Sequence, residues 1–285
     1  MAYTWTAPDI TEQPAAIIGG GVLGRRLAMM WASAGNTVVI YERIPQVAAA
    51  AIAYVEENID AQVNVIKGKR GAVRLASSLE DAVKDAWMVI EAVPERLEIK
   101  IPLFGELDKI TQPNCILATN SSSYRSSEMI ELVEKKYRVC NTHYFMPPIM
   151  NPVEIMTCGH TDPAIIQHLM EATKAVGFTP VHAKKESTGF IFNRIWAAMK
   201  RESLLVIQDG VATPEDIDTL FVSNFSAKVG ICELMDKVGL DTVYNIEKHY
   251  VEERKLPGTT LDWLKASYLD KGNLGDKSGK GLLAK

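Results

Sequence analysis

The sequence predicts an α/β fold, a doubly wound sheet followed by a smaller all-helical domain at the C-terminal end. Three observations support this. A glycine turn joins a short apolar run to a helical pattern, apolar runs and helical segments then alternate, and only helical patterns follow from about residue 187. Such alternation is typical of a sheet with helices on both faces. We therefore expect an α/β domain over residues 1–186 and a helical domain over residues 187–285.

The glycine turn lies between an apolar run at residues 15–18 and a helical pattern from residue 25. Gly19, Gly21 and Gly24 have the G-x-G-x-x-G spacing of a strand–turn–helix unit that binds dinucleotides. The first glycine permits the tight turn, the second lets a pyrophosphate approach the backbone, and the third lets the helix pack on the strand. The helix N-terminus offers N–H groups and a positive dipole end to phosphates. We expect a Rossmann-type dinucleotide site here.

Glu42 ends the next predicted strand, residues 36–42, and lies 18 residues after Gly24. A carboxylate at about this offset accepts hydrogen bonds from the adenosine ribose. It would repel a 2′-phosphate, so the sequence favours NAD over NADP, although the adjacent Arg43 weakens that preference. An ordinary glycine-rich turn is the alternative, and this context disfavours it.

The remaining elements follow from periodicity, capping residues and glycine or proline breaks. Ser78 is expected to cap a short helix, with Asp81 at the capping-box position. Residues 67–74 form a basic loop, expected to be a solvated connection; the alternative is a docking site for substrate phosphates. Further strands are expected at residues 87–93, 114–120, 138–145 and 152–157, and further helices at residues 45–64, 78–86, 97–109, 190–208, 214–224, 227–238, 241–253 and 260–268.

Composition excludes some classes of protein. The chain has 285 residues, 47% of them hydrophobic, and a net charge of −4, which argues against a nucleic-acid partner bound through bulk charge. The four cysteines form no C-x-x-C pair and are expected to be reduced thiols in the core. No secretory signal or bilayer-length apolar run is visible, so a cytoplasmic protein without a membrane or metal partner is expected.

His143 is the strongest candidate for acid–base chemistry, because it lies between a predicted strand and a proline-containing loop. A base that takes a hydroxyl proton while a hydride leaves needs the near-neutral titration that histidine provides. Glu154, 11 residues later in an apolar run, needs a buried partner and is expected to orient the imidazole. Taken alone, His143 would be interpreted as a structural histidine, and the presence of Glu154 shifts the balance toward catalysis.

Ser122 and Asn193 are the other candidates for contact with the substrate. A hydroxyl and a side-chain amide can each donate to an oxygen that alternates between alcohol and ketone. The structural alternatives are helix capping for Ser122 and a helix-end contact for Asn193.

Taken together, the motifs resemble the L-3-hydroxyacyl-CoA dehydrogenase family over nearly the whole chain. The motifs follow the family's order: the glycine turn, Glu42, VPERLEIK at residues 93–100, NSSS at 120–123, HYF at 143–145, Val153-Glu154, TGFIFNR at 188–194 and LGDKSGKG at 274–281. The resemblance implies an NAD-dependent oxidation of a 3-hydroxy group to a ketone, in fatty acid metabolism, by a homodimer. It assigns His143 as the base, Glu154 as its partner, and Ser122 and Asn193 as residues that bind the substrate oxygen. Cofactor contacts are expected at Gly19, Gly21, Val22, Leu23, Gly24, Glu42, Glu95, Lys100, Asn120 and Lys277.

The chain departs from the family pattern at two places. Met146 replaces the usual asparagine of the His-Phe-Phe-Asn-Pro motif and cannot donate a hydrogen bond. The segment between Glu42 and Ser77 is shorter than the family's helical hairpin that holds the CoA nucleotide. Two substrates therefore stay open, a 3-hydroxyacyl-CoA or a small hydroxy acid like those of the related carnitine and L-gulonate dehydrogenases. A non-catalytic NAD-binding protein is a third, less favoured, interpretation.

Overall fold

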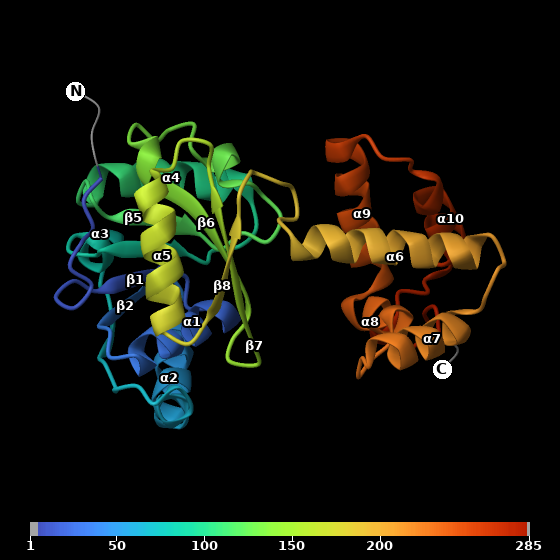
Figure 1. Cartoon of the computed structure of the whole chain (residues 1–285), viewed down its shortest axis with the longest axis horizontal. Coiled ribbons are helices and arrows are strands. Elements are labelled where there is room, and N and C mark those ends of the chain that lie inside the picture. The colour runs from blue at the N-terminus through green and yellow to red at the C-terminus, as the bar shows by residue number, and fades with distance from the viewer. Residues whose placement is uncertain (1–4, 284–285) are drawn as a thin grey trace. The chain divides into compact units, whose positions relative to one another are not determined.

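The computed structural model describes residues 5–283, and its backbone divides into two compact units, residues 1–190 and 191–285 (Figure 1). The domain division expected after residue 186 stays a prediction. In the structure, Phe190 packs with Met156 and Ala183 of the first unit.

The first unit is built on an eight-stranded sheet with the order β3-β2-β1-β4-β5-β6-β7-β8. Neighbouring strands run parallel except for β6 and β7, which form an antiparallel pair. The order reverses between β1 and β4, which is the switch point where doubly wound sheets bind ligands. The strands are β1 (Ala15–Ile18), β2 (Val38–Tyr41), β3 (Val73–Leu75), β4 (Met88–Glu91), β5 (Ile116–Thr119), β6 (Val139–Met146), β7 (Met150–Thr157) and β8 (Thr179–Ala183).

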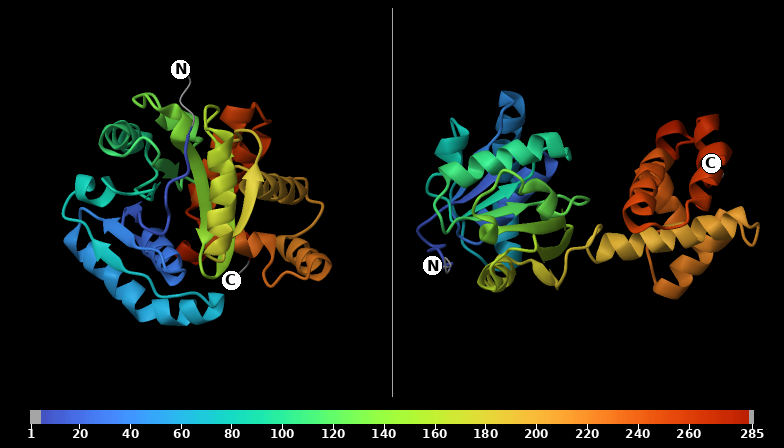
Figure 2. Two further views of the ribbon diagram at one scale, coloured as in Figure 1. Left: turned by 60° about the vertical axis from the view of Figure 1, so that its left-hand side comes forward. Right: turned by 90° about the horizontal axis from the view of Figure 1, so that it is seen from above.

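Helices cover both faces of this sheet because its central strands are apolar on both sides (Figures 1 and 2). Alternate residues of β1 show the division: Ile17 packs in the cluster that contains side chains of α1, α2 and α5, and Ile18 packs in the cluster of α3 and α4. These helices are α1 (Val22–Ser33), α2 (Pro45–Ile66), α3 (Leu79–Val83), α4 (Leu97–Ile110) and α5 (Pro163–Ala175).

The regular elements among the described residues of the second unit are all helices, apart from one isolated bridge. Its core brings together Leu204, Met235, Leu240 and Leu264, one from each of four helices. The helices are α6 (Phe192–Gln208), α7 (Pro214–Phe225), α8 (Ile231–Val238), α9 (Leu240–Arg254) and α10 (Thr259–Ser267).

The predicted fold class is confirmed, and the differences are local. Strand β3 lies at the end of the segment expected to be a loop, and α5 and β8 were not predicted. The short helix begins as expected, with Ser78 Oγ accepting a hydrogen bond from the N–H of Asp81 at 3.0 Å. Between residues 5 and 283, no helix has both the length and the apolar character needed to cross a membrane.

Candidate active site

The glycine turn between β1 and α1 has the shape that a pyrophosphate requires. A Cβ on Gly19 would lie 2.5 Å from the carbonyl oxygen of Ala92, and one on Gly24 would lie 1.9 Å from the carbonyl oxygen of Gly19. These two positions therefore tolerate only glycine. A Cβ on Gly21 would meet nothing within 4 Å, so the space beside this residue is open. Gly21 is also the N-cap of α1 and offers no side chain to the first N–H groups, which suits a bound phosphate.

Glu42 follows β2 directly and lies beside the glycine turn. Its Oε2 accepts a hydrogen bond from the N–H of Gly20 at 2.8 Å, and its Oε1 accepts one from the N–H of Ile44 at 3.0 Å. The two bonds fix the carboxylate at the edge of the turn. Because a carboxylate oxygen has more than one lone pair, each oxygen can also accept from a ribose hydroxyl. Val22 and Leu23, also expected to contact the cofactor, form the start of α1.

His143 and Glu154 lie directly opposite each other in the antiparallel pairing of β6 with β7. Nδ1 of His143 is 2.8 Å from Oε2 of Glu154, and the two residues are 5% and 3% exposed. An ionised carboxylate only accepts hydrogen bonds, so the proton lies on Nδ1 and Nε2 carries the lone pair. None of the described residues forms a hydrogen bond with Nε2. The imidazole therefore has one nitrogen held by an acid and one nitrogen available to a ligand.

His143 was expected at the end of a strand, but it lies inside β6. Strand β5 pairs with β6 only as far as Asn141, so His143 lies beyond the parallel part of the sheet. There β6 continues only in the hairpin with β7. The rings of Phe145 and Phe190 flank the imidazole, with centroids 4.7 and 5.0 Å from it. His143 therefore lies just past the carboxyl end of the parallel part of the sheet, and β6 continues beyond that point in the hairpin with β7.

The loop after β5 supports this strand and carries two of the expected residues. Oδ1 of Asn120 accepts a hydrogen bond from the N–H of Tyr144 at 2.9 Å, which fixes the backbone beside His143. Ser122 is exposed, with its hydroxyl 3.5 Å from that of Ser123. The buried Ser121 donates its hydroxyl hydrogen to Glu95 instead. Ser122 is therefore the serine of this loop that faces outward.

Lys100 was expected to contact the cofactor, but it is only 1% exposed. Its Nζ lies 2.6 Å from Oε1 of Glu91 and 3.2 Å from Oε2 of Glu95. Glu91 is fully buried and also accepts a hydrogen bond from Thr119 Oγ1 at 2.6 Å. Burial raises the pKa of Glu91, and Lys100 opposes that shift. The buried Lys100 thus holds Glu95 in place from the protein interior. The side chain of Glu95 is 37% exposed and can reach a ligand.

Glu91 and Ser121 are parts of this network that sequence reasoning missed. The signal for Glu91 was present, because a carboxylate at the end of an apolar strand run needs a partner. The same signal singled out Glu154. Ser121 carried no such signal. It is one of three consecutive serines, and the conformation of the loop decides which of them is buried.

Asn193 and Lys277 belong to the second unit. Asn193 is the second residue of α6, and Lys277 forms an ion pair with Asp241 at the start of α9. His143 belongs to the first unit. Their expected contacts with substrate and cofactor therefore stay predictions.

Two of the four cationic residues in the basic loop at residues 67–74, both of them arginines, are paired within the chain. Arg70 pairs with Glu56 and Asp60 of α2, and Arg74 pairs with Asp81 at 3.1 Å. Helix α2 is a single helix of 22 residues, and six residues connect it to β3. The loop therefore agrees better with a solvated connection than with a phosphate-docking site.

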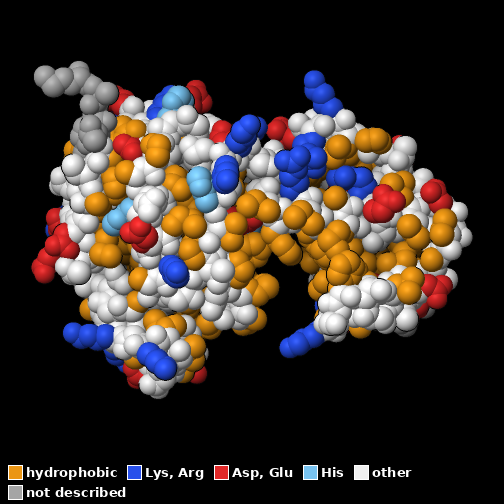
Figure 3. All heavy atoms as spheres, viewed as in Figure 1, with side chains coloured by type: hydrophobic (Ala, Val, Ile, Leu, Met, Phe, Trp, Pro, Cys, Tyr) orange, Lys and Arg blue, Asp and Glu red, His pale blue; other side chains and the backbone are white. Residues whose placement is uncertain are grey.

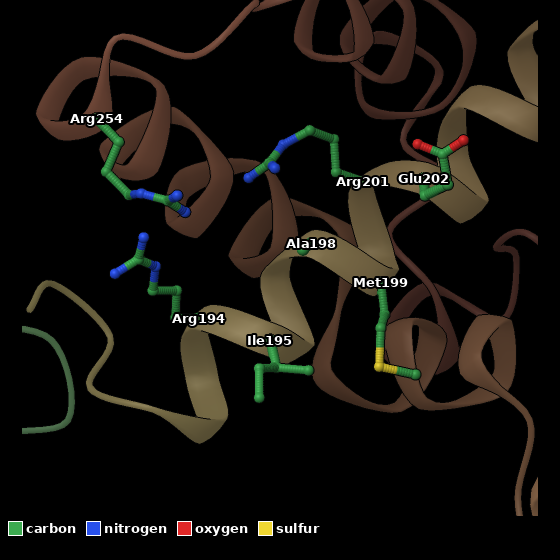
Figure 4. Close-up of a pocket in the computed structure, with 7 residues that line it drawn as sticks. All are labelled: Arg194, Ile195, Ala198, Met199, Arg201, Glu202 and Arg254. Atoms are coloured by element: carbon green, nitrogen blue, oxygen red, sulfur yellow. The ribbon is translucent and has the colours of Figure 1, made fainter. Parts of the chain in front are cut away.

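A cavity of about 590 Å³ lies within the second unit, between α6 and the end of α9 (Figure 4). Three arginines line it, and the guanidinium groups of Arg194 and Arg254 face each other in Figure 4. Burial and the charges of Arg194 and Arg201 lower the pKa of Arg254. Sequence reasoning missed this cavity because only packing brings the two helices together. The other lining residues are Ile195, Ala198, Met199 and Glu202.

Comparison with known proteins identifies the family. Residues 14–187 match the profile of the 3-hydroxyacyl-CoA dehydrogenase NAD-binding domain, and residues 189–285 match that of the 3-hydroxyacyl-CoA dehydrogenase C-terminal domain. The chain is 30% identical to a 3-hydroxybutyryl-CoA dehydrogenase of Mycobacterium tuberculosis over 95% of this chain and 97% of that protein.

Two further relatives agree. A 3-hydroxyacyl-CoA dehydrogenase-like protein, LAM1, of Cochliobolus heterostrophus is 48% identical over 51% of this chain, and the matched part spans 31% of that protein. The solved structure of the (S)-3-hydroxybutyryl-CoA dehydrogenase PaaH1 from Ralstonia eutropha superimposes with a TM-score of 0.85 at 26% identity, over 95% of this chain and 98% of that one. The chain therefore belongs to the 3-hydroxyacyl-CoA dehydrogenase family, as an NAD-dependent oxidoreductase that acts on CH–OH groups.

Proposed function

We propose that the protein interconverts a 3-hydroxy group and a 3-keto group, with His143 as the general base and Glu154 as the residue that orients it. One observation carries this proposal: the buried 2.8 Å contact between His143 Nδ1 and Glu154 Oε2. The contact leaves Nε2 as the acceptor, on a strand that extends beyond the carboxyl ends of the parallel strands. A base held in one tautomer by an acid is the arrangement that proton abstraction from a hydroxyl requires.

In the direction of oxidation, Nε2 of His143 takes the hydroxyl proton as the C–O bond gains double-bond character. Glu154 then stabilises the resulting imidazolium across the β6–β7 pair. When bound, NAD supplies the hydride acceptor. Gly19, Gly21, Val22, Leu23 and Gly24 would hold the pyrophosphate, and Glu42 the adenosine ribose. In the reverse direction His143 returns the proton to the ketone oxygen.

Ser122 and Asn193 are proposed to donate hydrogen bonds to the substrate oxygen. Glu95, Lys100, Asn120 and Lys277 are proposed to support the nicotinamide half of the cofactor; for Lys100 this support is indirect, through Glu95. Met146 ends β6 at the position where the family has an asparagine, so one donor to the ligands is missing there.

A second substrate class has support from α2. The resemblance to the family implies a helical hairpin between β2 and β3 that holds the CoA nucleotide, yet here one helix and a six-residue connection fill the segment. The basic residues Arg70 and Arg74 are paired within the chain. A small hydroxy acid is therefore the alternative to a 3-hydroxyacyl-CoA.

The experiment that tests the function is a reduction assay that follows NADH oxidation. Acetoacetyl-CoA, acetoacetate, dehydrocarnitine and 3-dehydro-L-gulonate are offered with NADH and then with NADPH. We expect turnover of at least one 3-oxo compound, with NADH strongly preferred because Glu42 repels a 2′-phosphate. Tight NADH binding without reduction of any compound in the panel would contradict the proposal and favour a non-catalytic NAD-binding protein.

We also propose that the protein is a homodimer formed through the second unit. None of the twelve residues of α7 is buried, and Leu220 and Phe225 of that helix are 62% and 69% exposed. Phe192 and Ile195 on α6 are about half exposed, and Figure 3 shows hydrophobic side chains gathered over α6 on one face. Exposed apolar surface of this kind is typical of an interface. Light scattering at several protein concentrations tests the proposed dimer.

A further inference from the structure

Two adjacent arginines, Arg25 and Arg26, lie near the N-terminal end of α1, directly after the glycine turn. This end of a helix carries the positive pole of the backbone dipole, so cations there are unfavourable unless an anion neutralises them. The first turn of α1 contains no acidic residue. Neither arginine forms an ion pair with any residue of the described chain. The two guanidinium groups and the helix N-terminus therefore concentrate positive charge at one place, without an acidic residue in the first turn of the helix to balance it.

The chain holds both side chains in position. The guanidinium groups lie over the ring of Tyr54 on α2, at 4.7 Å for Arg25 and 5.4 Å for Arg26. Nη1 of Arg26 also donates to the carbonyl oxygen of Pro147 at 2.9 Å. The Nε atoms of both arginines are inaccessible to solvent and have no partner among the described residues. The stacking and the anchor orient the two cations before any ligand arrives.

The anchor also locates the pair relative to His143. Pro147 follows β6 and lies four residues beyond His143. At about 3.3–3.6 Å for each extended residue, the backbones of these two positions are at most about 14 Å apart. Arg26 thus contacts the turn that follows β6, the strand that carries the proposed base, and both guanidinium groups lie on the side of α1 that faces α2. The ribose-binding Glu42 and the open space at Gly21 lie at the end of the helix instead.

We propose that Arg25 and Arg26 bind a carboxylate of the substrate, so that the protein acts on free 3-oxo and 3-hydroxy acids. This inference rests on the proposed function and names its substrate class. A carboxylate matches the fork of a guanidinium group and gains charge-assisted hydrogen bonds from it. The phosphates of a CoA ester lie at the far end of its pantetheine arm, and the arginines of the loop at residues 67–74 are already paired. A carboxylate close to the reacting carbonyl is the anion that fits this place.

The test compares two probes with the same carbon skeleton, acetoacetate and its methyl ester, in the variants Arg25→Met and Arg26→Met. For acetoacetate we expect kcat/KM to fall about 10- to 100-fold, the loss typical of one charge-assisted hydrogen bond. For methyl acetoacetate we expect a change below about threefold. Arg26→Lys keeps the charge and should recover part of the loss. Arg74→Met is the matched control, because this exposed arginine is neutralised by Asp81.

Three results would overturn the inference. Equal losses for the acid and the ester would mean that the arginines only support the fold around α1. A selective rise in the Kd of NADH would mean that they bind the cofactor pyrophosphate. A selective loss of activity with acetoacetyl-CoA would mean that they bind a phosphate of CoA.

Binding without turnover separates this inference from the proposed function. Calorimetry with acetoacetate and the protein saturated with NAD⁺ forms a complex in which no hydride can move, because both ligands are oxidised. If the wild type binds acetoacetate more tightly than Arg25→Met does, yet reduces nothing in the panel, the carboxylate site holds and the proposed function fails. Equal binding by the two proteins contradicts the carboxylate site, whatever the assay shows.

Discussion

Two buried acid–base pairs of the first unit differ in how many of their hydrogen-bonding groups the chain itself satisfies. Arg138 is 0% exposed and Asp108 is 2% exposed. Nη2 of Arg138 donates to Oδ1 of Asp108 at 2.8 Å, and Nη1 donates to the carbonyl of Gln112. Oδ2 of Asp108 accepts from the N–H of Glu134 at 2.9 Å. Burial opposes ionisation of Asp108, but these hydrogen bonds hold its pKa below the usual range.

His143 and Glu154 are buried almost as deeply, and one nitrogen of the imidazole has no partner among the described residues. Because the chain itself provides partners for both side chains, the Asp108–Arg138 pair is a structural cross-link between α4 and the start of β6. In the His143–Glu154 pair, by contrast, Nε2 has no hydrogen-bond partner among the described residues and can accept a hydrogen bond from a ligand. A buried acid–base pair therefore indicates function when one of its hydrogen-bonding atoms stays unpaired, and burial alone does not indicate it.

The largest effect expected is on turnover, from His143→Gln. Glutamine keeps a polar side chain of similar reach but cannot exchange a proton, so kcat should fall by about 10²- to 10⁴-fold. NADH binding, measured by fluorescence, should stay unchanged because the glycine turn is untouched. Near-normal turnover in this variant would show that the unpaired nitrogen is not the base.

The same kind of substitution in the closed pair should affect stability instead. Arg138→Met leaves the Asp108 carboxylate buried without its cation, and the free energy of unfolding should fall by about 3–5 kcal/mol. Urea denaturation measures this loss, and kcat of the folded fraction should stay near the wild-type value. The matched control is Lys135→Met, whose ammonium is half-exposed and 4.0 Å from Asp108, with an expected cost of about 0–1 kcal/mol. Similar losses in the two variants would remove the contrast between the pairs.

Lys200 sharpens the comparison because it is buried without forming any ion pair within the described residues. It is 5% exposed, and its Nζ lies 5.7 Å from the ring centre of Trp196. Burial lowers its pKa to about 8 from 10.5, so the folded state resists protonation. Below pH 8 the lysine is charged in both states and the folded state bears the cost. Between pH 8 and about 10.5 only the unfolded state is protonated, so stability rises with pH.

Lys200→Met should therefore raise the free energy of unfolding at pH 7 by about 3 kcal/mol, and the gain should disappear by about pH 10.5. Denaturation at several pH values measures it. Lys237→Met, at an exposed lysine paired with Glu233, is the control and should change stability by less than about 0.5 kcal/mol at any pH. A gain that did not depend on pH would mean that packing, and not charge, sets the effect.

The smallest of these effects should come from Glu154→Gln. The amide keeps the shape of the carboxylate but fixes the imidazole tautomer less strongly and does not stabilise an imidazolium, so kcat should fall about 10- to 100-fold. The urea midpoint should change little, which separates orientation from folding. An unchanged kcat with a lowered midpoint would place this pair in the same structural class as Asp108–Arg138.

Much of the fold could be predicted from local patterns. The glycine turn, the apolar strand runs and the helix signals each depend on a few neighbouring residues, and the predicted elements agree with β1, β2 and β4 to β7. β3 and β8 were missed because two of the eight residues of these two edge strands are charged or histidine and one is proline. An edge strand gains pairing from its neighbour without an apolar pattern of its own.

The sequence by itself determined which residue types are available: three glycines at fixed spacing, an acid after β2, and His143 and Glu154 in adjoining strands. Only the tertiary structure decided which of them meet. Antiparallel register places Glu154 opposite His143, burial turns Lys100 toward Glu91 and Glu95, and the packing of α1 on α2 brings two arginines over Tyr54. The physical reason is range, because a turn or a helix depends on neighbours along the chain, whereas pairing and burial depend on residues far away in sequence.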